Sequence, residues 1–105
     1  MIALVEENLE AINALCREYG VLRLELFGSA ATGEFDSERA DIEFLIEYPD
    51  GYDFGPWIGR YQDLLADLST LLGYPVRLVM ARAPYMEKPY HIAYVNESRQ
   101  VLYSA

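Results

Sequence analysis

The sequence predicts a single α+β domain covering residues 1–105, with a small mixed β-sheet and helices packed on it. Segments with the apolar period of a helix alternate with short apolar runs that have the period of a strand. No internal repeat, linker or low-complexity segment interrupts this order. With 105 residues, 52% of them hydrophobic and 24% charged, the chain has the composition of a globular protein with one modest core.

The first helix is indicated by an apolar stripe before Gly20, a residue suited to the left-handed position that follows a helix. The stripe has helical spacing and consists of Val5, Leu9, Ile12, Cys16 and Tyr19. In residues 22–26, leucines then alternate with an arginine and a glutamate. This alternation predicts a strand with one buried face.

A second strand is predicted for residues 41–48, where Leu45 interrupts the polar alternation as in a strand covered on both sides. A loop rich in Gly, Pro and Asp follows, and Pro56 at its end suits the first turn of another helix. That helix is expected to end at Gly73, after a broad apolar stripe of Tyr61, Leu64, Leu65, Leu68, Leu71 and Leu72.

The remainder of the chain predicts less regular structure. Residues 76–80 indicate a third strand, and residues 81–89 indicate an irregular segment. Residues 91–104 fit either a short helix or a final strand.

The charge balance argues against nucleic acid as a direct partner. The formal net charge is −9, from 17 acidic and 8 basic residues, and no basic run offsets it. Affinity for nucleic acid rests largely on Lys and Arg that neutralise phosphates, so this chain should be repelled. A basic protein partner is expected instead. The single Cys16, the absence of a signal peptide pattern and the absence of a long apolar run predict a cytoplasmic protein without membrane contact.

A turn of Gly28 and Ser29 follows the first predicted strand. A glycine at this place lets backbone N–H groups approach a phosphate closely, and a helix beginning at Ser29 would direct further amides at the anion. Gly33, four residues further on, relaxes the next turn. The segment therefore predicts a phosphate-binding turn, although a Gly-Ser pair after a strand is by itself usually only a turn.

An acidic pair opens the second predicted strand. Asp41 and Glu43 are two residues apart, so both project from one face of a strand with Cα atoms about 6.5–7 Å apart. Mg²⁺ prefers one or two carboxylates together with phosphate oxygens and water. Without a metal the two acids repel each other, so a cationic group is expected between them. Alone the pair fits a solvated strand face, but together with the turn it predicts a site for Mg²⁺ and a nucleotide.

The stretch LFGSAATGEFDSERADIEFLIEY resembles the signature of the minimal nucleotidyltransferases, small one-domain relatives of the DNA polymerase β superfamily. The resemblance continues through LLGYPVRLVMARAP and the tail KPYHIAYVNESRQVLYSA, so it covers nearly the whole chain. It implies that Gly28, Ser29 and Gly33 bind a nucleotide triphosphate. It also implies that Asp41 and Glu43 are the catalytic acids and hold Mg²⁺.

Arg77 departs from the family pattern, because active relatives commonly have there a third carboxylate that helps to activate the attacking hydroxyl. A guanidinium cannot act as a base, and loss of a general base typically lowers a rate by about 10²–10⁴-fold. Three arrangements stay open at this point. Arg77 pairs with Asp41 or Glu43 in place of a metal, or it contacts the triphosphate while Mg²⁺ stays on the acids. Alternatively, a one-residue shift in register turns Arg77 away from the site.

The resemblance also implies a partner. Minimal nucleotidyltransferases of this kind resemble the antitoxins of pairs whose toxin is a HEPN-type ribonuclease. In active pairs the antitoxin transfers AMP from ATP to a toxin tyrosine, and in others it acts by binding. We therefore expect an antitoxin that binds a HEPN-type toxin, with AMP transfer from Mg-ATP in doubt because of Arg77. The alternatives are a free-standing nucleotidyltransferase for another protein or a small molecule, and a non-catalytic dimeric scaffold.

Several aromatic residues remain outside these motifs. Trp57 and Phe54 beside the Gly-Pro loop either belong to a partner surface or cap the core. The same alternatives apply to the tyrosines near the end of the chain, which are Tyr85, Tyr90, Tyr94 and Tyr103. His91, the only histidine, is expected to be structural.

Overall fold

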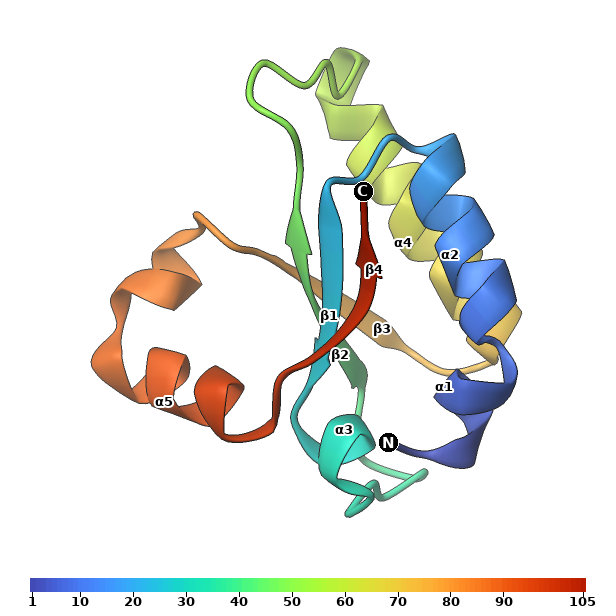
Figure 1. Cartoon of the computed structure of the whole chain (residues 1–105), viewed down its shortest axis with the longest axis vertical. Coiled ribbons are helices and arrows are strands. Elements are labelled where there is room, and N and C mark those ends of the chain that lie inside the picture. The colour runs from blue at the N-terminus through green and yellow to red at the C-terminus, as the bar shows by residue number, and fades with distance from the viewer.

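The computed structural model describes all 105 residues and contains a four-stranded sheet with helices on both faces (Figure 1). The strands lie in the order β3-β2-β1-β4. β1 pairs antiparallel with β2 and β4, whereas β2 pairs parallel with β3, so the sheet is mixed. The predicted fold class is confirmed. The strands are β1 (Arg23–Phe27), β2 (Ile42–Glu47), β3 (Val76–Met80) and β4 (Gln100–Ser104).

The helices divide between the two faces of the sheet. Two 3₁₀ helices, η1 (Pro56–Ile58) and η2 (Pro84–Glu87), accompany five α-helices. These are α1 (Ala3–Glu7), α2 (Leu9–Glu18), α3 (Ser29–Thr32), α4 (Gly59–Leu72) and α5 (Pro89–Ser98). Helices α1, α2 and α4 lie on one side of the sheet, and α5 with η2 lies on the other (Figure 1). No helix combines the length and the apolar character that a membrane crossing requires.

Two apolar clusters hold these layers together. The larger cluster joins the sheet to α1, α2 and α4, and its fully buried members include Ile12, Leu24, Phe44, Leu64 and Leu68. The smaller cluster lies between the sheet and α5 and consists of Phe27, Leu45, Val79 and Val95. Leu45 is 4% exposed, which confirms that β2 is covered on both faces.

The elements differ from the sequence predictions at several boundaries. The first apolar stripe is divided between α1 and α2 at Asn8, whose side-chain amide donates to the Leu4 carbonyl over 2.8 Å. Such a bond competes with the helical backbone and favours a break. Pro56 begins a short 3₁₀ helix before α4. The ambiguous segment 91–104 contains most of α5 as well as β4, because β4 finds its hydrogen-bond partners on β1.

Glu25 contradicts the prediction that the polar face of β1 is solvated. Glu25 is only 3% exposed, and its two carboxylate oxygens accept hydrogen bonds from Arg99 Nε (3.1 Å) and Nη2 (2.6 Å). Arg23 Nη2 lies 3.4 Å from the same carboxylate. Burial acts to raise the pKa of Glu25, but the bonds from both arginines outweigh it and the pKa lies below its ordinary value. The pair with Arg99 ties β1 to the junction of α5 and β4.

Candidate active site

The turn at Gly28 has a backbone that only glycine adopts readily. Its φ is +74° and its ψ is −154°, a region closed to side chains with a Cβ. An added Cβ would collide with the Glu43 carboxylate and would stand 2.6 Å from the Tyr94 hydroxyl. The Gly28 N–H donates to Ser98 Oγ over 2.7 Å. The end of β1 is therefore in direct contact with both β2 and α5.

Helix α3 begins at Ser29, as the sequence suggested, and ends after one turn. Gly33 follows it with φ +90° in the left-handed region and donates its N–H to the Ser29 carbonyl over 3.0 Å. Ser29 is partly exposed at the first position of α3. Gly28, Ser29 and Gly33 thus belong to one compact turn, in which the N–H groups of Gly28 and Gly33 donate hydrogen bonds within the chain.

The acidic pair lies beside this turn. Glu43 is paired with Phe27 in the antiparallel ladder, which brings its side chain to the last residue before Gly28. Tyr94 of α5 donates its hydroxyl hydrogen to Glu43 Oε2 over 2.8 Å. Asp41 is exposed and stands just before β2 begins. The structure therefore brings Glu43 into contact with the turn and leaves Asp41 open to solvent at its side.

Arg77 supplies a cationic group beside Glu43. It is the register partner of Glu43 in the parallel β2–β3 ladder, and its Nη1 lies 3.3 Å from Glu43 Oε1. The guanidinium carbon also lies 4.8 Å from the centre of the Tyr85 ring, a cation–π arrangement. The His91 ring stacks on Tyr85, with centroids 3.8 Å apart. Arg77 consequently faces the site and is held from two sides. A register that turns it away is not observed.

Tyr94 completes the contacts of Glu43. Its ring packs edge-to-face on Phe27, with centroids 5.9 Å apart. Burial and the bond to Glu43 raise the pKa of Tyr94 to about 12. The phenol is therefore protonated at neutral pH and remains a hydrogen-bond donor to Glu43.

The donor chemistry of the pair fits Mg²⁺ only after a rearrangement. Asp41 and Glu43 offer two hard oxygen donors, the number that Mg²⁺ takes when phosphate oxygens and water supply the rest. No group of three or more His, Cys, Asp or Glu side chains lies close enough together to hold a metal ion by itself. Both oxygens of Glu43 are engaged, by Arg77 and by Tyr94. A metal on Glu43 would have to displace at least one of these contacts.

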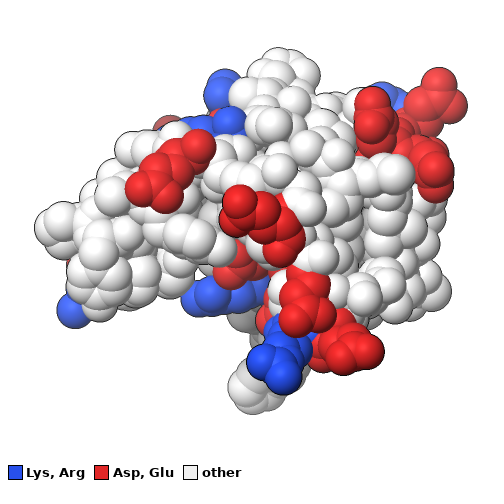
Figure 2. All heavy atoms as spheres, turned by 90° about the horizontal axis from the view of Figure 1, so that it is seen from below, with Lys and Arg blue, Asp and Glu red and all other residues white.

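Acidic side chains surround this end of the molecule. The segment between Gly33 and β2 exposes Glu34, Asp36, Glu38 and Asp41, with Arg39 as its only cation. Figure 2, which views this end, shows more acidic than basic groups, with Lys and Arg interspersed among the acids. A free triphosphate is repelled by such a field, so a nucleotide would need a cation to enter.

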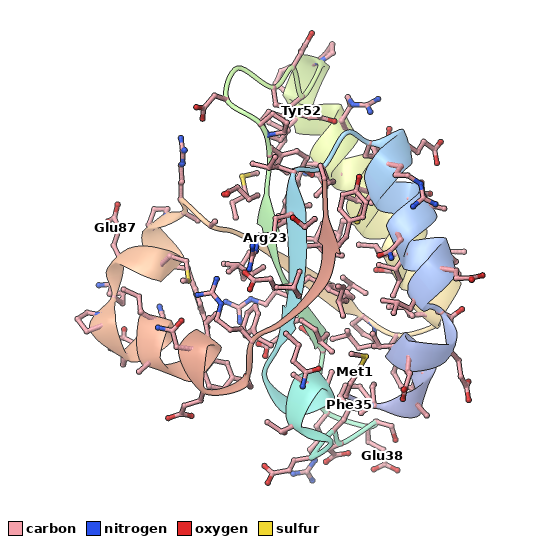
Figure 3. The ribbon with its side chains drawn as sticks, in the orientation of Figure 1. Met1, Arg23, Phe35, Glu38, Tyr52 and Glu87 are labelled. Atoms are coloured by element: carbon pink, nitrogen blue, oxygen red, sulfur yellow. The ribbon has the colours of Figure 1, made fainter.

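The same face of the sheet carries a second polar feature. Arg23 projects toward the side on which α5 lies (Figure 3). It lines a cavity of about 240 Å³ together with Glu25, Leu45, Glu47, Ala81 and Arg99. Neither Asp41 nor Glu43 lines this cavity, but its lining residue Leu45 is two residues from Glu43 on the same face of β2.

Tyr94 and Ser98 are site residues that sequence reasoning did not find. They are 51 and 70 residues away from their partners Glu43 and Gly28. No local motif marks them, because only the packing of α5 brings them to the turn. The one available signal was the concentration of tyrosines near the end of the chain, which the sequence alone could not assign to the site.

Comparisons with known proteins agree with this geometry. Residues 9–102 match the family described as the nucleotidyltransferase domain. No curated protein matches the sequence. Among solved structures, one described as a minimal nucleotidyltransferase has a TM-score of 0.70 and 27% identity, covering 94% of this chain and 95% of that one. A toxin–antitoxin structure with AMP-PNP has a TM-score of 0.69 and 25% identity, covering 93% and 74%.

A third solved structure shows likeness in fold alone, at 20% identity. It is the complex of a tri-AMPylated HEPN toxin from Shewanella oneidensis with its MNT antitoxin, at a TM-score of 0.63, covering 95% of this chain and 72% of that one. The three neighbours are thus described as a minimal nucleotidyltransferase, as a toxin–antitoxin structure with AMP-PNP, and as an MNT antitoxin with its HEPN toxin. The family match spans most of the chain and includes the Gly-Ser turn, the acidic pair and β3. The chain belongs to the nucleotidyltransferase domain family.

Proposed function

We propose that this protein is an antitoxin of the minimal nucleotidyltransferase type, which binds a HEPN-type toxin and transfers AMP only weakly. The observation that carries the weak transfer is that both oxygens of the Glu43 carboxylate are engaged. The Arg77 guanidinium lies 3.3 Å from one, and the Tyr94 hydroxyl donates to the other over 2.8 Å. The similarity to a toxin–antitoxin structure with AMP-PNP supports an antitoxin role and an adenine nucleotide, and the likeness in fold to an MNT antitoxin in complex with a HEPN toxin supports the choice of partner. A cytoplasmic location fits such a pair.

The residues of the site have distinct roles in this proposal. Gly28 and Ser29 would bind the triphosphate through their amides, Gly33 would support the turn, and Asp41 with Glu43 would hold Mg²⁺. When bound, Mg²⁺ neutralises part of the phosphate charge, which is a principal requirement of phosphoryl and nucleotidyl transfer. Before the triphosphate can bind, Ser98 must release the Gly28 N–H that it accepts at 2.7 Å.

Arg77 explains why transfer should be weak. It occupies one oxygen of Glu43, and it cannot take a proton from an attacking hydroxyl because it stays charged. The loss of a general base alone lowers a rate by about 10²–10⁴-fold. Neutralisation of the toxin by binding does not depend on this base. An acidic chain with a net charge of −9 is suited to cover the RNA-binding, hence basic, surface of a ribonuclease.

The test uses the protein together with the HEPN-type product of the adjacent gene. The two proteins are co-expressed and co-purified, and then incubated with labelled ATP and Mg²⁺. We expect a stable complex, little label in the toxin with the wild type, and more label with Arg77→Asp. Asp41→Asn should abolish the label, whereas the matched exposed acid Glu34→Gln should leave it unchanged.

Failure of the two proteins to associate would contradict the antitoxin role. Label on an acceptor other than the toxin would instead favour a free-standing nucleotidyltransferase. Label equal in the wild type and Arg77→Asp would show that Arg77 does not weaken the reaction.

A further inference from the structure

The loop between β2 and α4 exposes two large apolar side chains. Trp57 is 95% exposed and Ile58 is 46% exposed. Both have a left-handed backbone, with φ of 58° and 50°, which is uncommon for residues other than glycine and a true outlier for a β-branched residue. A strained backbone that holds tryptophan in solvent gains nothing for the chain alone, and such outliers concentrate at functional sites.

The base of this loop is fixed, although its tip is exposed. The rings of Tyr48, Tyr52 and Phe54 pack with centroids 4.6–4.8 Å apart. Arg60 in α4 donates from Nε to the Tyr52 hydroxyl over 2.6 Å, and its backbone N–H donates to the Phe54 carbonyl over 3.0 Å. A tip presented on a rigid base loses little conformational entropy when a partner binds.

A cavity of about 240 Å³ opens in the same loop. The aromatic rings of Tyr48, Tyr52 and Phe54 line it, together with two carboxylate residues, Glu47 and Asp50, and one cation, Arg82. Aromatic walls with carboxylates nearby suit the side chain of a Lys or Arg. Arg82 pairs with Asp50 at 3.1 Å, but both side chains are more than 80% exposed, so an incoming cation can replace this weak pair.

The charge of the loop indicates what kind of partner fits it. Residues 47–59 contain three acids and no Lys or Arg, and the whole chain carries −9. An anionic lipid surface is therefore disfavoured, whereas a basic protein surface is favoured. The loop lies at the end of the molecule opposite α3 (Figure 1), and Figure 3 shows Tyr52 at that end, far from Glu38. A partner bound there does not have to contact the turn at Gly28.

From these observations we infer that Trp57, Ile58 and the adjoining cavity form a docking surface for a basic protein. The surface inserts an apolar tip into the partner and receives a Lys or Arg from it. The identification of the HEPN-type toxin as that partner rests on the proposed function. Because this surface lies at the opposite end of the molecule from α3, docking there allows the chain to bind the toxin even when AMP transfer is lost.

The experiment exploits the fact that Trp57 is the only tryptophan of the chain. The full chain is labelled with 5-fluorotryptophan, and its single ¹⁹F resonance is followed as unlabelled toxin is added. We expect the resonance to shift and broaden in the complex. Trp57→Ala should weaken binding by about 10- to 30-fold in Kd, the effect of a central aromatic anchor. Tyr90→Ala is the matched control, because Tyr90 is an aromatic residue 65% exposed on α5.

The outcomes separate this docking surface from the proposed function. If the wild type binds the toxin but the ¹⁹F resonance and the affinity of Trp57→Ala are unchanged, the docking surface is refuted and the antitoxin role stands. If the resonance shifts with protein concentration alone, the surface joins two copies of this chain, which also overturns the inference. If the wild type does not bind the toxin at all, the proposed function itself fails.

Discussion

Replacement of Arg77 by aspartate should make the stability of this protein depend on Mg²⁺. The substitution removes the ion pair with Glu43, in which the Arg77 side chain is 46% exposed and that of Glu43 is 14% exposed. A partly exposed pair contributes about 0–1 kcal/mol, and the cation–π contact with Tyr85 adds about 0.5–1 kcal/mol. Their loss alone therefore costs about 1 kcal/mol.

The new carboxylate adds repulsion to this loss. Residue 77 is the register partner of Glu43, and neighbouring strands lie about 4.8 Å apart. Two charges about 5 Å apart repel by about 1–3 kcal/mol at effective dielectric constants of about 80–20. We expect Arg77→Asp to lower the free energy of unfolding by about 2–4 kcal/mol without metal. Saturating Mg²⁺, at about 100 times its Kd, should restore about 2.7 kcal/mol.

Urea denaturation with and without MgCl₂, against NaCl of equal ionic strength, measures this effect. Arg77→Met removes the charge without adding an acid, and should cost about 1 kcal/mol with a smaller response to Mg²⁺ than Arg77→Asp, because it frees Glu43 but supplies no third carboxylate. Arg82→Asp makes the same change of charge at an exposed pair with Asp50, and should be nearly neutral. Arg77→Asp could instead prove no less stable than Arg77→Met and show no change in stability with Mg²⁺. The carboxylate at position 77 would then not lie close to Glu43, and the reasoning about the metal site would be refuted.

Three further predictions concern the packing around the site. Gly28→Ala should lower the free energy of unfolding by about 2–5 kcal/mol in urea, because its φ of +74° strains any Cβ and the new methyl group collides with Glu43; a loss under about 0.5 kcal/mol would contradict this. The pKa of Glu25 lies below its ordinary value of 4.5, so its contribution to stability is present above about that pH and disappears as the pH falls through the folded-state pKa. Acid titration of stability should therefore be shallower in Glu25→Gln than in the wild type, and equal slopes would argue against the Arg99 pair. Burial raises the pKa of Cys16 to about 12, so iodoacetamide should label this thiol only in denaturant; rapid labelling of the native protein at mildly alkaline pH would contradict its burial.

Much of the fold could be predicted because its signals are local. The helical stripes and the alternation in β1 and β2 depend on residues a few positions apart, and so do the glycines that end α2 and α4. The turn at Gly28 and the start of α3 at Ser29 also follow from local chemistry. The helices depart from the predicted boundaries at two places. At Asn8 a side-chain amide competes with the helical backbone, and after Pro56 the left-handed backbone of Trp57 and Ile58 separates a 3₁₀ turn from α4.

Only part of the candidate site could be predicted from the sequence. Gly28, Ser29 and Gly33 lie within six residues of one another, and the acids are two residues apart, so spacing alone grouped each set. Their roles in binding a nucleotide and a metal stay predictions. The residues that contact Glu43 lie in β3 and α5, far along the chain, and no periodicity in the sequence predicts these contacts.

The sequence by itself determined the family resemblance, the Gly-Ser turn, the acidic pair and the presence of an arginine where a carboxylate was expected. Only the tertiary structure decided that Arg77 turns toward Glu43, because the register of a parallel pair depends on the crossover through α4 rather than on the strand itself. The same holds for Glu25, which is buried because Arg99, 74 residues away, provides its counter-charge. Local periodicity specifies faces and turns, whereas charge partners across the sheet appear only when distant segments pack together.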